Sequence, residues 1–194
     1  MTTKVDKPVD GIIRHSYLAN EIVFERKADA PLEKLWSFVD QPDNLVKWVG
    51  GRLDKFEVEV GGKYEICIAP QWNVMVSGTV LEYEPKRILH FTWDIPGWGN
   101  SPNLYGSAIK IEAWGDGAGS RIRFTHTVPY DAGREHLFAG AWHLHLDQLE
   151  ELLKGNDRNY KIETSVLFEM VRKYMAKDFD ARLSFYKHVL FIED

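Results

Sequence analysis

The sequence predicts an α+β domain in which a curved antiparallel sheet packs against one long helix. Most of residues 20–129 alternates between apolar and polar side chains, which is typical of half-buried strands. Residues 138–155 instead repeat apolar side chains at the helical period. Because a helix with one apolar face must cover something, the sheet is its simplest partner. The residues that share this face are Phe138, Trp142, Leu146, Leu149 and Leu153.

The elements before the long helix follow in a definite order. A strand at residues 20–28 precedes two short helices, of which Pro31 can open the first because its fixed φ suits a first helical turn. Pro42 starts the second helix, which runs through Trp48. Gly78, inside a later strand, indicates a bulge or a close approach of another chain segment. Six more strands, about seven in all, are expected at residues 56–60, 64–68, 74–83, 87–94, 105–114 and 120–129.

We divide the chain into three parts. Residues 1–19 are polar and lack a pattern, so we expect a loosely held N-terminal arm. Residues 20–155 form the domain, and residues 156–194 form a helical C-terminal extension, either one bent helix or two. Its apolar residues repeat at the helical period in two stripes. These are Ile162, Val166, Met170 and Tyr174, and then Phe179, Leu183, Tyr186 and Leu190.

The long helix also carries apolar residues on its outer side. Leu137, Ala141 and Leu144 lie there, where Leu is unexpected. We predict that the extension covers them, either in its own chain or in a partner's. A homodimer through residues 160–190 is therefore a candidate assembly.

Composition excludes several classes of partner. A net charge of −5 and a pI near 5.8 provide no field for a phosphate backbone, so we expect no nucleic acid. The single cysteine, Cys67, cannot form an internal disulfide and is expected to be a small buried side chain. No apolar run reaches the roughly 20 residues of a membrane span, and residues 1–20 lack the apolar middle of a signal peptide. We therefore expect a cytoplasmic protein without a membrane span.

The order and content of these elements resemble a known family. The matching segments are Ala30–Trp36 (APLEKLW), Gly61–Tyr64 (GGKY), Glu84–Trp93 (EPKRILHFTW) and Gly140–His143 (GAWH), running on to Asp147. Together they resemble the START-like or SRPBCC superfamily, which has the helix-grip fold and includes polyketide cyclases. Within it, the AHSA-type group, the homologues of the activator of the heat-shock-protein ATPase, is the most similar. The resemblance covers residues 21–155.

A sheet that grips a helix leaves a cleft between them, and such clefts are common ligand sites. The alternation points Phe91, Trp93, Phe124 and His126 toward this space, with Trp142 and His145 opposite. Trp72 and Trp98 lie in loops that could form the rim. Ordinary core packing is the alternative for Phe91 and Phe124, and a hydrogen-bonded core histidine is the alternative for His126. His145 is expected to present a polar tip to a ligand.

The candidates for chemistry are few. His143 and His145 point roughly 160° apart on a helix, so they cannot bind the same metal ion. His126 and His145 could approach each other across the cleft, but the sequence offers no third ligand to complete a metal site. We therefore predict no metal and no cofactor. No Gly-x-Ser-x-Gly motif and no phosphate-binding glycine loop occurs. His126 or Asp94 remains a candidate acid or base, because an aromatic cleft can shift a pKa.

Three hypotheses for function follow. The first is non-catalytic binding of a small, largely apolar molecule, lipid-like or aromatic, oriented by His126 and His145. The second is a cyclase-like or hydrolytic enzyme that uses His126 or Asp94 as acid or base. The third, which the resemblance suggests, is a co-chaperone-like module that acts on a chaperone ATPase, with a role in stress response. We favour the first hypothesis, and we therefore expect a binding protein rather than an enzyme.

Overall fold

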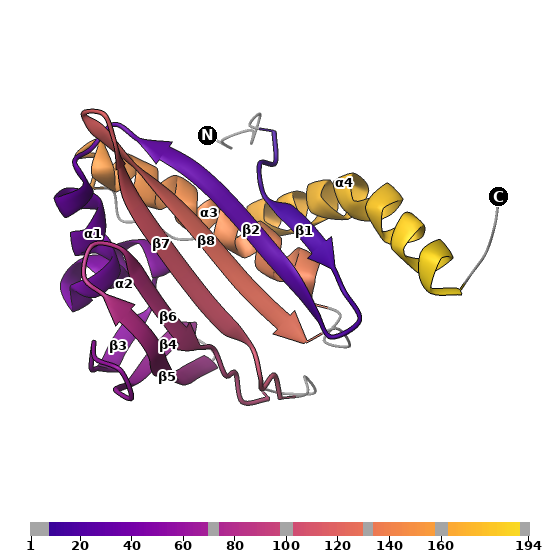
Figure 1. Cartoon of the computed structure of the whole chain (residues 1–194), viewed down its shortest axis with the longest axis horizontal. Coiled ribbons are helices and arrows are strands. Elements are labelled where there is room, and N and C mark those ends of the chain that lie inside the picture. Colours follow the sequence, from indigo (N-terminus) through magenta and orange to yellow (C-terminus); the bar gives the residue numbers. More distant parts are fainter. Residues whose placement is uncertain (1–7, 70–73, 98–102, 130–133, 158–162, 191–194) are drawn as a thin grey trace.

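The computed structural model describes residues 8–69, 74–97, 103–129, 134–157 and 163–190, with only the helical backbone for residues 180–190. Its strands form one curved layer, and α3 lies along the inner side of that layer (Figure 1). The strands are β1 (Ile12–His15), β2 (Ala19–Ala28), β3 (Arg52–Phe56), β4 (Lys63–Ala69), β5 (Val74–Glu84), β6 (Ile88–Thr92), β7 (Ala108–Asp116) and β8 (Gly119–Pro129). The helices are α1 (Leu32–Asp40), α2 (Pro42–Val49), α3 (Glu135–Leu153) and α4 (Thr164–Leu190).

The eight strands form a single antiparallel sheet that curves without closing. Its order is β1-β2-β8-β7-β6-β5-β4-β3, so β2 lies beside β8 and the other strands are joined to their sequence neighbours. The order of β2, two helices, six strands and a long helix confirms the α+β prediction. Helices α1 and α2 follow β2, and the Trp48 indole N–H of α2 donates 2.8 Å to the Phe38 carbonyl oxygen of α1.

The N-terminal region differs from the expected loose arm. Residues 12–15 form β1, an eighth strand that pairs with β2, with Ile12 opposite Val23 and His15 opposite Asn20. Ile13 faces the core and is 8% exposed, whereas Ile12 is 51% exposed. Four residues are too short a run to show alternation clearly in the sequence, so the pairing depends on the neighbouring strand.

A second correction concerns the strand expected at residues 56–60. The observed β3 ends at Phe56, and Val60, expected on its apolar face, is 67% exposed. The chain turns instead, with the Gly62 N–H donating 2.8 Å to the Glu59 carbonyl oxygen. A Cβ on Gly62 would lie 2.3 Å from the Glu57 carbonyl oxygen, so the turn requires glycine at this position.

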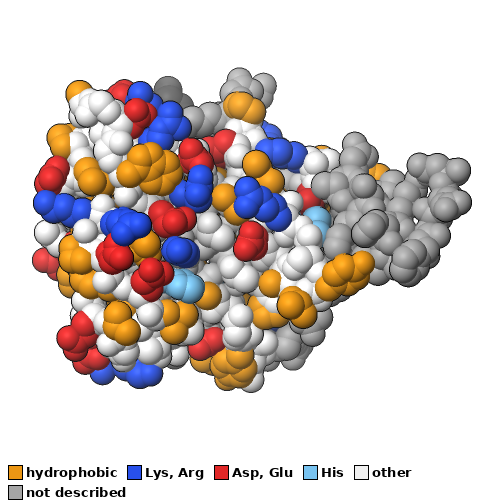
Figure 2. Space-filling view, viewed as in Figure 1, with side chains coloured by type: hydrophobic (Ala, Val, Ile, Leu, Met, Phe, Trp, Pro, Cys, Tyr) orange, Lys and Arg blue, Asp and Glu red, His pale blue; other side chains and the backbone are white. Residues whose placement is uncertain are grey.

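The two faces of the sheet have different chemistry. On β8, Ile122, Phe124 and Val128 are buried toward α3. The opposite face carries intermingled acidic and basic side chains, as the red and blue groups of Figure 2 show. Among them, Arg123 Nη2 lies 2.9 Å from Glu25 Oε2 on the neighbouring strand. The apolar core therefore lies on one side of the sheet, where α3 covers it.

The extension forms one long helix, α4, rather than two, and it packs against α3 of its own chain. Gly140 makes this approach possible, because a Cβ there would lie 3.1 Å from Val171 Cγ2. Met170 and Tyr174 are buried in the contact, and Leu144 is covered, whereas Leu137 remains 39% exposed. The predicted cover is therefore intramolecular and partial. No helix in the described part of the chain is both long and apolar enough to cross a membrane.

Candidate functional site

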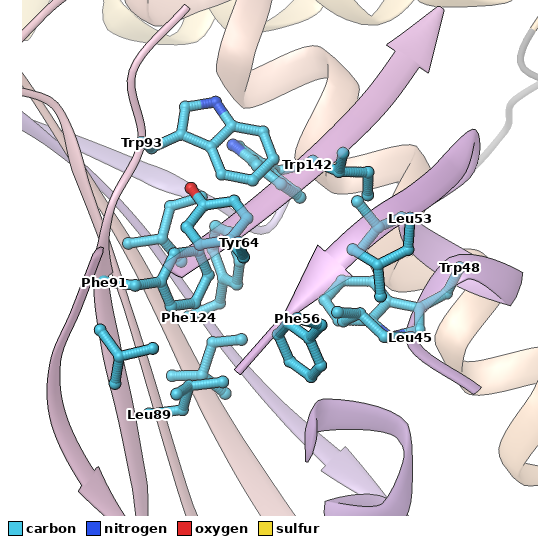
Figure 3. A pocket seen from close by; sticks show the side chains of 15 residues that line it. Leu45, Trp48, Leu53, Phe56, Tyr64, Leu89, Phe91, Trp93, Phe124 and Trp142 are labelled. Atoms are coloured by element: carbon cyan, nitrogen blue, oxygen red, sulfur yellow. The ribbon is translucent and has the colours of Figure 1, made fainter. Parts of the chain in front are cut away.

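An aromatic cluster fills the centre of the space between sheet and helix. The Trp93 ring lies 5.3 Å from the Trp142 ring and 6.3 Å from the Phe91 ring, measured between centroids. Phe124 lies 4.5 Å from Trp142 in the same way, and Tyr64 of β4 lies 5.2 Å from Phe91. Figure 3 shows these rings converging from the sheet and from α3. The structure thus brings together four residues expected in the cleft, Phe91, Trp93, Phe124 and Trp142.

The inner end of the cleft is almost filled by these side chains. A cavity of about 30 Å³ remains there. This space holds a water molecule or two but no organic ligand of ordinary size. The expected open room between sheet and helix is therefore absent at this end. The lining residues include Leu45, Trp48, Phe56, Tyr64, Leu89, Phe91, Trp93, Phe124 and Trp142.

A larger pocket of about 290 Å³ lies at the outer end of the cleft, and we call it the outer pocket. Its size is close to the lower end of the range for small-molecule sites. Val49, Trp93 and Trp142 line both cavities, so the two cavities adjoin each other. The described residues that line the outer pocket are Val49, Ile68, Val74, Trp93, Ile95, Pro96, Arg134, Leu137, Phe138, Ala141, Trp142, His145 and Leu167.

His126 is fully buried and bonded through both ring nitrogens. The Trp142 indole N–H, which can only donate, bonds to His126 Nδ1 at 3.0 Å. Nδ1 must therefore be an acceptor, so that the proton resides on Nε2, which donates 2.5 Å to Ser107 Oγ. Burial lowers the pKa of His126 to about 3, which keeps the ring neutral at pH 7. The residue holds Trp142 in place and is not among the described residues that line the outer pocket.

His145 differs from His126 because it reaches the outer pocket. Its Nδ1–H donates 2.7 Å to the Trp48 carbonyl oxygen, which can only accept, so Nε2 carries a lone pair in the neutral ring. Burial lowers the pKa of His145 to about 4, although the Trp48 carbonyl favours the protonated ring and opposes this. The ring also lies 5.4 Å from the Trp142 ring, which places it in the wall of the outer pocket.

The remaining candidates lie elsewhere. Asp94 Oδ1 accepts a hydrogen bond of 3.2 Å from the Gly106 N–H, and the backbone of Asp94 pairs with Ser77. Asp94 therefore helps to position the chain between β6 and β7, and it is not among the described residues that line either cavity. Trp72 and Trp98 fall outside the described residues. Among those described, no group of three His, Cys, Asp or Glu side chains is placed to hold a metal ion.

Comparison with known proteins identifies the family. The model of the family "Activator of Hsp90 ATPase homolog 1-like protein" (AHSA1) matches residues 29–154. The chain belongs to this family. The match lies within the domain expected at residues 20–155 and confirms the AHSA-type resemblance. A search of curated proteins found no match.

Solved structures have the same AHSA1-like fold. Protein MLL2253 from Mesorhizobium loti is 26% identical, with a TM-score of 0.62, over 71% of this chain and 99% of its own. CalU16 from Micromonospora echinospora is 18% identical, with a TM-score of 0.65, over 86% of this chain and 93% of its own. EF2215 from Enterococcus faecalis, described as a protein of unknown function, is 16% identical, with a TM-score of 0.67, over 88% of this chain and 91% of its own.

The AHSA1 segment supplies most of the outer pocket but not all of it. Leu167 of α4 lies beyond residue 154, so the extension adds a wall to the pocket of the family domain. Sequence reasoning missed Leu137, Ala141 and Leu167 as site residues. Leu137 and Ala141 did give a signal, because they stood out as apolar residues on the outer side of the long helix. No local pattern connects Leu167 with them.

Proposed function

We propose that the protein binds a small, largely apolar molecule in the outer pocket. The observation that supports this is the cavity of about 290 Å³, whose described lining is apolar apart from Arg134, His145 and the indole nitrogens of Trp93 and Trp142. A ligand that buries about 300 Å² of apolar surface gains on the order of 7 kcal/mol before the entropic cost of association. We therefore expect dissociation constants between millimolar and micromolar. The AHSA1 fold is compatible with such binding.

The pocket provides its own fluorescence reporters. Trp93 and Trp142 line it, so a bound molecule should alter the protein's tryptophan emission. The test is a titration with fatty acids, sterols and aromatic polyketides, using wild type and the variant Ala141→Phe. Because Ala141 lines the outer pocket, the larger ring is expected to fill it and to weaken binding at least tenfold.

A matched control addresses the inner cavity. Val80 lines the inner cavity of about 30 Å³, and Val80→Ile adds one methylene group there. This variant should bind as wild type does, since the outer pocket is unchanged. A panel that produces no response from the wild type, or an equal response from Ala141→Phe, contradicts the proposal.

The other hypotheses have less support in the geometry. The enzyme hypothesis depends on His126 and Asp94, and neither is among the described residues that line the outer pocket. The co-chaperone hypothesis depends on the family description alone, and fold similarity does not transfer a function. Measurement of chaperone ATPase activity with the purified protein would test it. A cytoplasmic location likewise stays a prediction.

Association with a second copy also stays a prediction. The basis for this prediction is the exposed side of α4, where Phe168, Met175 and Phe179 are 54%, 52% and 65% exposed. Figure 1 shows α4 extending beyond the sheet.

A further inference from the structure

Neither tryptophan that lines the outer pocket offers a hydrogen bond to a ligand. The Trp142 indole N–H is already bonded to His126 Nδ1. The Trp93 Nε1–H bonds to no group in the described part of the chain, but this nitrogen is fully enclosed by protein and does not reach the pocket surface. Polar recognition in this pocket therefore depends on the other side chains that line it.

The same pocket contains an acceptor. His145 donates its Nδ1–H to the Trp48 carbonyl oxygen, and its Nε2 has no hydrogen-bond partner among the described residues. Unlike the buried His143 Nε2, His145 Nε2 is not a fully enclosed atom, and the residue lines the outer pocket. The ring is neutral at pH 7 because burial lowers its pKa to about 4. Nε2 can therefore accept a hydrogen bond from a ligand hydroxyl group.

We propose that the ligand of the outer pocket is an apolar molecule that carries a hydroxyl group, which donates a hydrogen bond to His145 Nε2. This inference depends on the proposed function. It adds the chemical class, namely hydroxylated aromatic or alicyclic compounds. A neutral imidazole cannot donate from Nε2 while Nδ1 holds the proton, so a carboxylate near it would face a lone pair.

The one charged residue in the described lining, Arg134, points to the competing class. Arg134 already takes part in an interaction of its own. An apolar carboxylate could pair with its guanidinium group, which would favour anionic ligands. The proposed class and this alternative differ in charge, so a single series of ligands separates them.

The experiment uses calorimetric titration of the full-length protein at pH 7 with four probes of one ring system. In 2-naphthol the oxygen both donates and accepts, in 2-methoxynaphthalene it only accepts, and naphthalene has neither function. Loss of the donor, from 2-naphthol to 2-methoxynaphthalene, is expected to weaken binding about 3- to 10-fold, the value of one hydrogen bond. 2-Methoxynaphthalene and naphthalene should bind with similar affinity. The fourth probe, 2-naphthoate, is expected to bind more weakly than 2-naphthol.

Two variants assign this difference to a residue. His145→Phe should remove the difference between 2-naphthol and 2-methoxynaphthalene, whereas Trp93→Phe should leave it in place. Leu137→Ala, a control in the same pocket, should weaken all three probes by one factor. Because the ratios between probes are compared, a general loss of affinity in a variant does not imitate the expected result.

The outcomes separate this inference from the proposed function. Equal binding of the three neutral probes, or tightest binding of 2-naphthoate, overturns the hydroxyl assignment and leaves an apolar pocket in place. Failure of all four probes to bind overturns both proposals.

Discussion

At the scale of single residues, the pocket wall depends on two neutral histidines. His126 is fixed as a neutral tautomer because the Trp142 indole can only donate to it. His145 is fixed by the Trp48 carbonyl, which can only accept. In both cases a backbone or side-chain partner selects the tautomer, and burial lowers the pKa, to about 3 for His126 and about 4 for His145. The two rings therefore take no charge at physiological pH.

We predict a pH dependence from these pKa values. The unfolded chain protonates these histidines near pH 6.5, whereas the folded protein does so only near pH 4 and pH 3. Their contribution to stability is therefore complete above about pH 6.5 and is lost as the pH falls through the folded values. NMR titration of the imidazole carbons should show both rings neutral at pH 5. A midpoint near 6.5 for either ring would contradict the assignment.

At the scale of elements, the contact of α4 with α3 shapes the site. Tyr174 of α4 accepts a hydrogen bond of 3.0 Å from the Gly11 N–H, and its hydroxyl oxygen lies 3.0 Å from His143 Nδ1 on α3. Asp178 accepts hydrogen bonds of 2.9 Å from both His15 of β1 and His136 of α3. The extension is therefore anchored to two other elements. These contacts join β1 and α4, both outside the family segment, to each other and to α3.

Gly140 offers a direct test of this contact. We predict that Gly140→Leu lowers the free energy of unfolding by about 1–3 kcal/mol, because the added side chain meets Val171 across the contact. Amide hydrogen exchange in residues 164–179 should become faster as α4 separates. Gly115→Leu is the matched control, since no atom lies within 4 Å of a Cβ at Gly115. Unchanged exchange in α4 of the Gly140 variant would show that the two helices do not pack as described.

At the scale of the whole molecule, the C-terminal extension contributes to the outer pocket together with the AHSA1 segment. The AHSA1 match ends at residue 154, whereas the outer pocket takes Leu167 from α4. Tyr174 of α4 contacts the buried His143 of α3, so α4 contributes to the burial of that face. The described cover lies within one chain, and Phe168, Met175 and Phe179 of α4 remain exposed.

Truncation after Gly155 tests these roles together. We predict a lower melting temperature, because the partners of the buried Met170 and Tyr174 become exposed, and weaker binding in the outer pocket, because Leu167 is lost. If the protein is a dimer through α4, light scattering should also show a monomer after truncation. The Ala141→Phe variant serves as a control, since it blocks the pocket but keeps α4. A truncated protein with unchanged stability, binding and mass would refute the structural role of the extension.

The sequence by itself determined the order of the elements from β2 to α3, because alternation and helical periodicity are local properties of the chain. It also identified the inward face that carries Phe91, Trp93 and Phe124. It could not show how far these rings fill the space, because the volume left over depends on packing between distant segments. It also missed β1, whose four residues form a strand only beside β2.

Only the tertiary structure decided which cavity can hold a ligand and which polar groups face it. His126 and His145 were expected to orient the same ligand, yet one is enclosed by Ser107 and Trp142 and the other reaches the outer pocket. Leu167 joins that pocket although it lies 22 residues after His145 in the sequence. The physical reason is that a site depends on contacts between residues far apart in the chain, and periodicity within one segment carries no information about them.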